Sequence, residues 1–243
     1  MKRCRIIWLV ALACIVGAPV IVSAGEGDVG VDLSGEWIAE YVTTTETRLP
    51  VIGGFDTTTE AEVAVEIEQR GDQVMMTTRT CSIDMSTDLP MADTKVPDAF
   101  VDSLSEQRRR VRLRDGGDGL EFVSEKLREV LGVRLDDPGS DKLPEDDDDE
   151  RVYDHDGDGN PGVTIRIEGV VSGDIYVVRN GWDRWYGLVT DEDRIDGRII
   201  WETEQNVVGA SRRILSRQPE AHPHDDPDKN YFRMRRVDDG LGC

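Results

Sequence analysis

Histidine, cysteine and aromatic residues are scarce in this chain of 243 residues. It has three histidines and four cysteines, and aromatic residues make up 6% of it. No Gly-x-Ser-x-Gly sequence, phosphate-binding glycine loop or dinucleotide fingerprint occurs, so the common nucleophile and nucleotide sites are missing. Fifty acidic residues leave a carboxylate-based hydrolase open, but their abundance favours no particular pair. We therefore expect a protein that is not an enzyme.

Long apolar runs are missing after the N-terminal segment. A basic start at residues 1–5 precedes the apolar stretch Ile6–Val22, and the small residue Ala24 follows, which is the layout of a cleavable signal peptide. Two alternatives stay open: an uncleaved membrane anchor, and a lipid anchor at Cys14. We expect cleavage after Ala24, a secreted or periplasmic protein, one domain over residues 25–243, and no membrane-spanning helix after cleavage.

Basic residues are also few compared with acidic ones. The whole chain carries 29 basic and 50 acidic residues, and its formal charge is −21. Because three basic residues and no acidic residue lie in residues 1–24, the remaining chain has a formal charge of −24. That balance disfavours nucleic acid and anionic lipid as partners, since both require a positive surface, and it favours cations.

Only two cysteines remain once the signal peptide is removed. They are Cys81 and Cys243, and in an oxidising compartment we expect a disulfide between them. The alternative is two unpaired thiols.

The two-residue period of β-strands dominates the chain, and long helical periodicity is almost absent. Ala61, Val63, Val65 and Ile67 alternate with glutamates, and residues 70–72 turn the chain into a second strand. We expect a mainly β fold, an antiparallel up-and-down barrel of about eight to ten strands with at most one short helix. Strands are expected at 37–42, 60–68, 73–82, 111–114, 120–123, 163–171, 175–179, 185–190, 195–208 and 231–237. A loop is expected at 84–97, and 123–131 fits a short helix or a strand.

An acidic segment at residues 135–162 is too long for an ordinary connection, so it is either functional or disordered. Near its end, Asp154, Asp156 and Asp158 alternate with glycine-containing spacers that let the backbone curl. Oxygen-rich clusters of this kind suit calcium, with the backbone carbonyl of Asn160 as a fourth ligand. The alternative is a solvated acidic loop. His155 lies outside the alternation and is expected at the surface.

The Asp-x-Asp-x-Asp-Gly order over about nine residues resembles the calcium loops of dockerin modules and thrombospondin type 3 repeats, and the first half of an EF-hand loop. The resemblance implies that Asp154, Asp156 and Asp158 are ligands and that Gly159 is the turn glycine. The twelfth position of an EF-hand loop, a bidentate acid, is Ile165 here. Further ligands would have to come from residues 146–150 or from water.

Gly35-Glu36-Trp37 opens the first expected strand, and Arg233 and Arg235 lie in the last one. This layout resembles that of lipocalins and their calycin relatives, in which a basic side chain from near the end of the barrel covers the tryptophan. The resemblance implies an up-and-down barrel with a ligand-sized interior. An ordinary tryptophan at a strand start is the alternative.

Aromatic residues are candidates for a ligand pocket. The set is Trp37, Trp185, Tyr186 and Trp201, which would suit a small apolar or sugar-like ligand. Core packing is the alternative. His222 and His224 have a spacing that fits zinc, but no third ligand is evident and a loop surface is expected. The sequence thus favours an exported, calcium-stabilised binding protein over a structural or surface-interaction protein with a packed core.

Overall fold

The computed structural model describes residues 30–49, 53–89, 92–238 and 240. Twelve strands, one α-helix and two 3-10 turns occur in this part of the chain. The strands are β1 (Gly35–Leu49), β2 (Gly53–Arg70), β3 (Gln73–Thr87), β4 (Ala92–Lys95), β5 (Gln107–Gly116), β6 (Gly119–Ser124), β7 (Leu127–Leu131), β8 (Val163–Gly169), β9 (Gly173–Asp191), β10 (Arg194–Ala210), β11 (Glu220–Pro223) and β12 (Tyr231–Arg236). The helix is α1 (Asp98–Ser103), and the 3-10 turns are η1 (Arg213–Leu215) and η2 (Pro227–Lys229).

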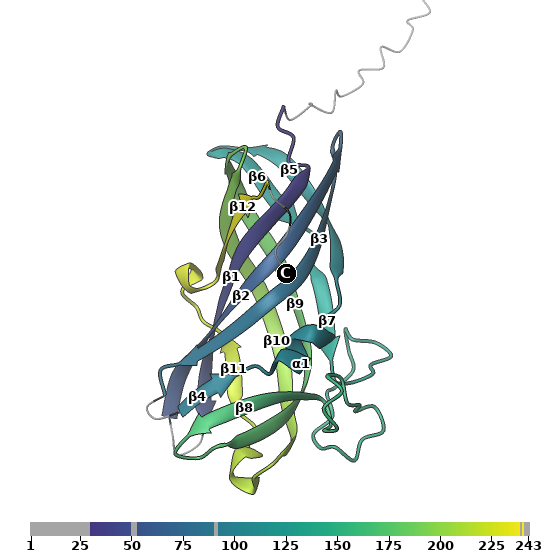
Figure 1. The fold of residues 1–243 in the computed structure, drawn as a ribbon, viewed down its shortest axis with the longest axis vertical. Helices are drawn as coiled ribbons and strands as arrows, with labels where there is room; N and C mark the ends of the chain where they lie inside the picture. Colours follow the sequence, from purple (N-terminus) through teal and green to yellow (C-terminus); the bar gives the residue numbers. More distant parts are fainter. Residues whose placement is uncertain (1–29, 50–52, 90–91, 239, 241–243) are drawn as a thin grey trace, which may run out of the picture.

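All twelve strands belong to one sheet, and every pairing between them is antiparallel. Eight of them form a ring in the order β12, β1, β2, β3, β5, β6, β9 and β10, which closes where β10 pairs with β12 (Figure 1). The ring is uneven because the long strand β9 pairs successively with β6, β7 and β8 on one side. The expected mainly β, antiparallel barrel-like meander is confirmed.

The β2–β3 hairpin shows how alternation in the sequence determines the faces of the sheet. Ala61, Val63, Val65 and Ile67 are buried, and the glutamates between them are exposed. Gly71 has a φ of 63°, a conformation that glycine adopts without steric cost, so a two-residue turn joins the strands. The expected hairpin is present, with longer arms than the sequence pattern indicates.

Two local expectations were wrong, and one open choice was decided. The segment 123–131 forms parts of β6 and β7, which is the strand alternative, and the single helix α1 lies earlier in the chain, at 98–103. Residues 84–97 include the end of β3 and all of β4. The strands expected separately at 175–179 and 185–190 are one strand, because β9 runs through Asn180-Gly181 and Gly181 pairs with Thr203 of β10. A Cβ on Gly181 would lie 3.0 Å from the Glu202 carbonyl oxygen, so close strand packing, not a turn, requires this glycine.

The end of the barrel near the β2–β3 turn is filled by apolar side chains. We call this group the upper core; its largest fully buried members are Trp37, Trp185, Phe122, Phe232, Leu33, Ile67, Met76, Ile195 and Met234. The Trp185 ring centroid lies 4.7 Å from that of Phe232 and 5.6 Å from that of Tyr41. Such packing leaves this part of the interior to protein atoms.

Trp37 lies opposite Arg236 in the β1–β12 register, and the guanidinium carbon of Arg236 is 4.5 Å from the indole centroid. A basic side chain of the last strand therefore covers this tryptophan. The expected residues, Arg233 and Arg235, were the wrong ones: because side chains alternate along a strand, both are on the outer face, whereas Arg236 shares the parity of the buried Met234.

Arg236 also ties three chain segments together. Its guanidinium donates to the backbone carbonyls of Ser34, Asp32 and Glu192. The first two carbonyls precede β1, and the third lies in the β9–β10 turn. The same arginine thus covers Trp37 and fixes the approach to the first strand.

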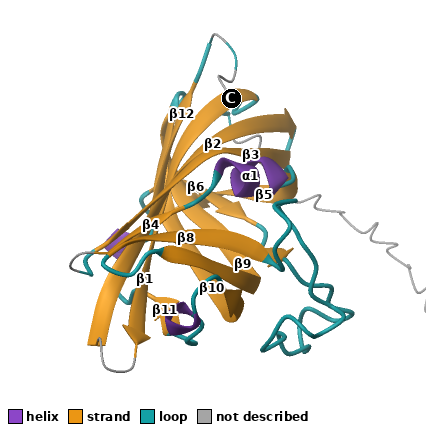
Figure 2. Cartoon of the chain, turned by 60° about the horizontal axis from the view of Figure 1, so that its bottom comes forward, coloured by secondary structure: helices purple, strands orange, loops and turns teal. Residues whose placement is uncertain are grey.

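The segment between β7 and β8, residues 132–162, packs on the outer face of β9 and β10 (Figure 2). Val133 and Leu143 of this long loop form a small buried cluster with Val178 and Val208. The Asn206 side chain donates to the Pro144 carbonyl at 2.9 Å. The long loop has little regular secondary structure, as expected, but it contacts the barrel at several points, among them Val133, Pro138 and Leu143.

The N-terminal predictions lie outside the described residues. These are the signal peptide at 1–24 and the lipidation alternative at Cys14. Cys243 lies outside them too; Cys81 sits at a β-bulge of β3, between Thr80 and Ser82, and its pairing with Cys243 stays a prediction. In the described part of the chain, no helix is long and apolar enough to cross a membrane.

Replacing Arg236 by lysine tests the contact over Trp37. Lysine keeps the charge but cannot reproduce the planar donor array, so Arg236→Lys should lower the free energy of unfolding by about 1–3 kcal/mol in urea denaturation. Arg235→Lys is the matched control and should change it by less than about 0.5 kcal/mol, because that side chain is exposed. Equal effects of the two substitutions would refute the role of Arg236.

Candidate functional site

The aspartate loop, residues 153–162, is anchored to β9 by two glycines of the long loop. A Cβ on Gly162 would lie 2.3 Å from the Val177 carbonyl oxygen, and a Cβ on Gly132 would lie 2.6 Å from the Gly162 Cα. Both glycines have positive φ angles, 77° and 71°. Only glycine lets the backbone approach the barrel this closely. The start and end of the aspartate loop are also joined by hydrogen bonds between Tyr153 and Gly162 and between His155 and Gly162.

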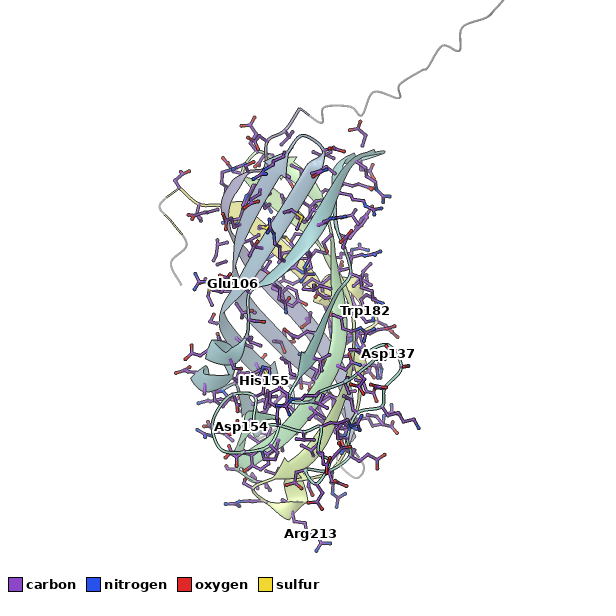
Figure 3. All side chains as sticks on the ribbon, turned by 90° about the vertical axis from the view of Figure 1, so that its right-hand side faces the viewer. Glu106, Asp137, Asp154, His155, Trp182 and Arg213 are labelled. Carbon is purple, nitrogen blue, oxygen red and sulfur yellow. The ribbon has the colours of Figure 1, made fainter. Side chains whose placement is uncertain are left out.

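Asp154, Asp156 and Asp158 come together as the sequence predicts. One carboxylate oxygen from each lies within 4.8 Å of the others. Asp154 and Asp158 are exposed, and Asp156 is partly buried. Figure 3 shows the aspartate loop near the surface, with Asp154 and His155 labelled. Oxygens at this spacing could all reach one cation.

Backbone and hydroxyl groups hold the three carboxylates in place. Asp154 accepts hydrogen bonds from the Gly157 and Gly159 backbone amides at 2.8 and 2.9 Å. Asp156 Oδ2 accepts from the Thr164 amide at 2.9 Å, and Asp158 Oδ2 accepts from the Thr164 hydroxyl at 2.6 Å. These bonds leave Asp156 Oδ1 buried and without a hydrogen-bond partner among the described residues. One acceptor of the cluster therefore has an unused lone pair.

The pKa values of the clustered aspartates move apart. Burial, together with the neighbouring Asp158 and Asp154 carboxylates, raises the pKa of Asp156. Burial acts in the same direction on Asp158, but hydrogen bonds from Thr164 and Asn160 outweigh it and lower the pKa of Asp158. Without a cation, the Asp156 carboxyl thus ionises less readily than that of Asp158.

The other predicted members of the calcium site lie in different places. Asn160 donates its backbone amide and its side-chain amide to Asp158. No acid of residues 145–150 joins the three-aspartate group in the described part of the chain. Ile165, at the position of the missing twelfth ligand, belongs to β8.

His155, expected at the surface, is partly buried beneath the aspartate loop. Its Nδ1 lies 2.8 Å from the Tyr153 hydroxyl and 3.4 Å from the Gly132 amide nitrogen. Its Nε2 is buried. The imidazole therefore supports the contact between the two ends of the long loop.

His222 and His224 belong to the surface around β11. His222 is exposed near Glu46, and His224 Nε2 lies 3.0 Å from the Lys229 ammonium nitrogen. A neighbouring cation disfavours zinc at His224. Among the described residues, neither histidine belongs to a group of three metal-ligating side chains.

The four aromatic residues of the predicted ligand pocket are divided between two faces. Trp37, Trp185 and Trp201 all belong to the upper core. Tyr186 is on the outer face, where its hydroxyl donates to Glu121 at 2.6 Å. Neighbouring residues of a strand point to opposite faces, so Trp185 and Tyr186 cannot line the same interior pocket.

The barrel interior contains a polar layer that the sequence analysis missed. Along the inward face of β9, Trp185 belongs to the upper core, Asp183 and Arg179 follow, and Val177 belongs to a second apolar cluster. The Arg109 guanidinium, only 4% exposed, binds Asp183 with nitrogen–oxygen distances of 2.6 and 3.3 Å. The interior thus has two apolar regions separated by charged side chains.

Further polar groups extend this layer. Gln107 contacts Arg109 and donates to Glu129, and Arg179 donates to the Thr203 hydroxyl at 2.9 Å. Burial, and then the Asp183 carboxylate, raise the pKa of Tyr41. The polar layer has unused donors, since Arg109 Nε and Trp185 Nε1 are buried without a partner among the described residues. The alternation in β5, where Arg109 occupies an inward position between Gln107 and Val111, was the available sequence signal.

No known protein family, curated protein or solved structure matches this chain.

Replacing Gly162 by alanine tests the anchor of the aspartate loop. Gly162→Ala should collide with the Val177 carbonyl, loosen the long loop and increase its amide hydrogen exchange in the presence of chelator. The control is Gly157→Ala, which shares a positive φ of 72° but has open space around its Cβ. It should show only the backbone strain of about 1–2 kcal/mol. Equal exchange in both variants would contradict the anchoring contact.

Proposed function

We propose that this protein is an exported β-barrel binding protein in which calcium stabilises the long acidic loop. The observation that carries the calcium assignment is the convergence of Asp154, Asp156 and Asp158, with the Asp156 Oδ1 buried and unpartnered among the described residues. Three hard oxygen donors, with no sulfur or imidazole ligand in the group among the described residues, favour calcium over a transition metal. Thr164, Asn160 and water supply the remaining oxygens.

In the aspartate loop, the bound ion would balance carboxylate charge that otherwise has no counter-ion. Residues 135–162 contain twelve acidic and two basic residues, a formal charge of −10. Calcium lowers the mutual repulsion of the clustered carboxylates and joins the aspartate loop to Thr164 of β8. The site differs from an EF-hand because it lies between strands and has no acid at position 165. Its likeness to dockerin and thrombospondin type 3 loops is limited to the aspartate spacing.

The lipocalin-like part of the proposal rests on two features. One is the ring of eight antiparallel strands, and the other is the contact of Arg236 with Trp37. Both belong to the up-and-down barrel architecture that the resemblance implies. They support an interior that receives a small molecule.

The polar layer is the best candidate for such a ligand site. The unused donors on Arg109 and Trp185 favour a ligand rich in acceptor oxygens, such as a sugar, over an apolar one. The rival is a structural or surface-interaction protein with a filled interior, and the packing of the upper core favours it.

Removing calcium should destabilise the protein. With calcium at tenfold excess over its dissociation constant, the ion contributes about 1.4 kcal/mol, so a chelator should lower Tm by about 3–6 °C in calorimetry. Asp156→Asn should abolish this response because it removes a charged ligand. Asp118→Asn, in the exposed β5–β6 turn, is the control and should retain it. A melting curve that does not change with chelator would refute the calcium site.

Native mass spectrometry of the protein from its own source tests the interior site. We expect a retained small molecule that is released on denaturation, and no such mass in the variant Arg179→Leu, which removes one charge of the polar layer. A mass that accounts for protein and calcium alone would favour the rival, a barrel filled by its own side chains.

A further inference from the structure

A basic surface lies on the outside of this acidic protein. It consists of four exposed arginines, Arg110 and Arg112 of β5, Arg184 of β9 and Arg198 of β10, which we call the basic face. Within the described part of the chain, none of their guanidinium groups forms an ion pair or hydrogen bond. Acidic neighbours are already engaged: Glu121 binds Arg114 and Tyr186, and Asp196 binds Arg194.

The strand register makes the basic face continuous. Arg112 is opposite Val123, Val123 is opposite Tyr186, and Tyr186 is opposite Arg198. Three strand spacings of about 4.8 Å therefore separate Arg112 from Arg198 by roughly 14 Å. Arg184 lies opposite Ile200, whose side chain is 52% exposed. Arginine beside exposed apolar surface is typical of protein interfaces.

The acidic run, Glu145–Glu150, lies farther along the same side of the barrel. It follows Pro144, which is hydrogen-bonded to Asn206 on the outer face of β10. A Cβ on Gly209 of β10 would lie 3.8 Å from Asp147 Oδ2. All six residues except Asp149 are exposed, and Asp149 is paired with Arg151. Five exposed carboxylates thus remain available to a partner.

The basic face and the acidic run are arranged for two-fold pairing. Arg198 and Asn206 are on the same face of β10 and eight residues apart, or about 26 Å at 3.3 Å per residue. Midway between them is Glu202, which pairs with Trp182 in the β9–β10 register. Figure 3 shows Trp182 and Asp137 of the long loop on the same side of the molecule. A two-fold axis near Trp182 and Glu202 would bring each basic face onto the acidic run of the other copy.

We propose that a second copy of this chain occupies the basic face, in an antiparallel dimer with two equivalent contacts between a basic face and an acidic run. Such an interface is isologous and closes after two copies. The net negative charge opposes association at long range, but salt screens that repulsion beyond about 8–10 Å, while close ion pairs are screened less. The dimer does not involve the interior ligand, and because the acidic run belongs to the long loop, the dimer is tested with calcium present.

Sedimentation velocity on the full mature chain, with calcium present, tests the proposal. We expect a dimer at low salt that dissociates in 1 M salt, where the Debye length is about 3 Å. The double variant Arg112→Glu/Arg198→Glu should weaken the dimer at least about tenfold, because it faces the acidic run with like charge. Asp146→Lys/Asp147→Lys should do the same from the other side.

Mixing the two charge-reversed variants gives the decisive result. In a mixed dimer both contacts are complementary, one between reversed surfaces and one between original surfaces, so association should return to within a few fold of the wild type. The control Arg48→Glu/Arg70→Glu changes the net charge equally at exposed sites elsewhere and should leave the dimer intact. Circular dichroism spectra confirm that each variant is folded.

Two outcomes would overturn the proposal. One is a mixture that stays monomeric although both variants are folded. The other is a wild-type chain that is monomeric at low salt but binds a heparin column through Arg112 and Arg198, which would assign the basic face to an external polyanion.

Discussion

Closure of the strand ring by its last member, a strand of only six residues, is the constraint on which the rest of the structure depends. β12 has six residues, yet it pairs with both β1 and β10. Just before β12 begins, the Asn230 side chain continues the link between β1 and β10. Its oxygen accepts hydrogen bonds from the Thr44 amide of β1 and from the Trp201 indole of β10. At the other end of β12, Arg236 covers Trp37 and binds carbonyls of the neighbouring segments. The upper core is enclosed only because both ends of this strand are fixed.

Features determined by neighbouring residues could be predicted from the sequence. Alternation identified the β2–β3 hairpin, and aspartate spacing identified the group at residues 154–158, because both are local patterns. Predictions failed where contacts between distant segments decide the outcome. Asn180-Gly181 reads as a turn, but β10 supplies a partner for every residue there and β9 continues through it. Residues 123–131 fit a helix or a strand by local pattern, and the pairing of Val123 and of β7 with β9 decides for strand.

The polar layer in the barrel interior also depends on a contact between distant segments, which the sequence alone does not reveal. Alternation in β5 places Arg109 on the inward face, but the local pattern does not identify its partner. Its partner Asp183 is 74 residues away in the sequence. Only closure of the ring places the two side chains together, and the desolvation of Arg109 then requires the carboxylate. A buried ion pair of this kind favours one register across the neighbouring strands β5, β6 and β9, since a shift of one strand by one residue would leave either charge alone.

Acidic and basic side chains are separated along the outer surface of β9 and β10. The loop places its acidic residues over one half of these strands, while arginines occupy the other half. If the loop were free, its carboxylates could fold back onto the arginines of the same molecule and neutralise them. The contacts of Gly132 and Gly162 with the barrel, and of Pro144 with Asn206, hold the acidic run away from them. Both surfaces stay unneutralised within one chain, and a second molecule can therefore satisfy both at once.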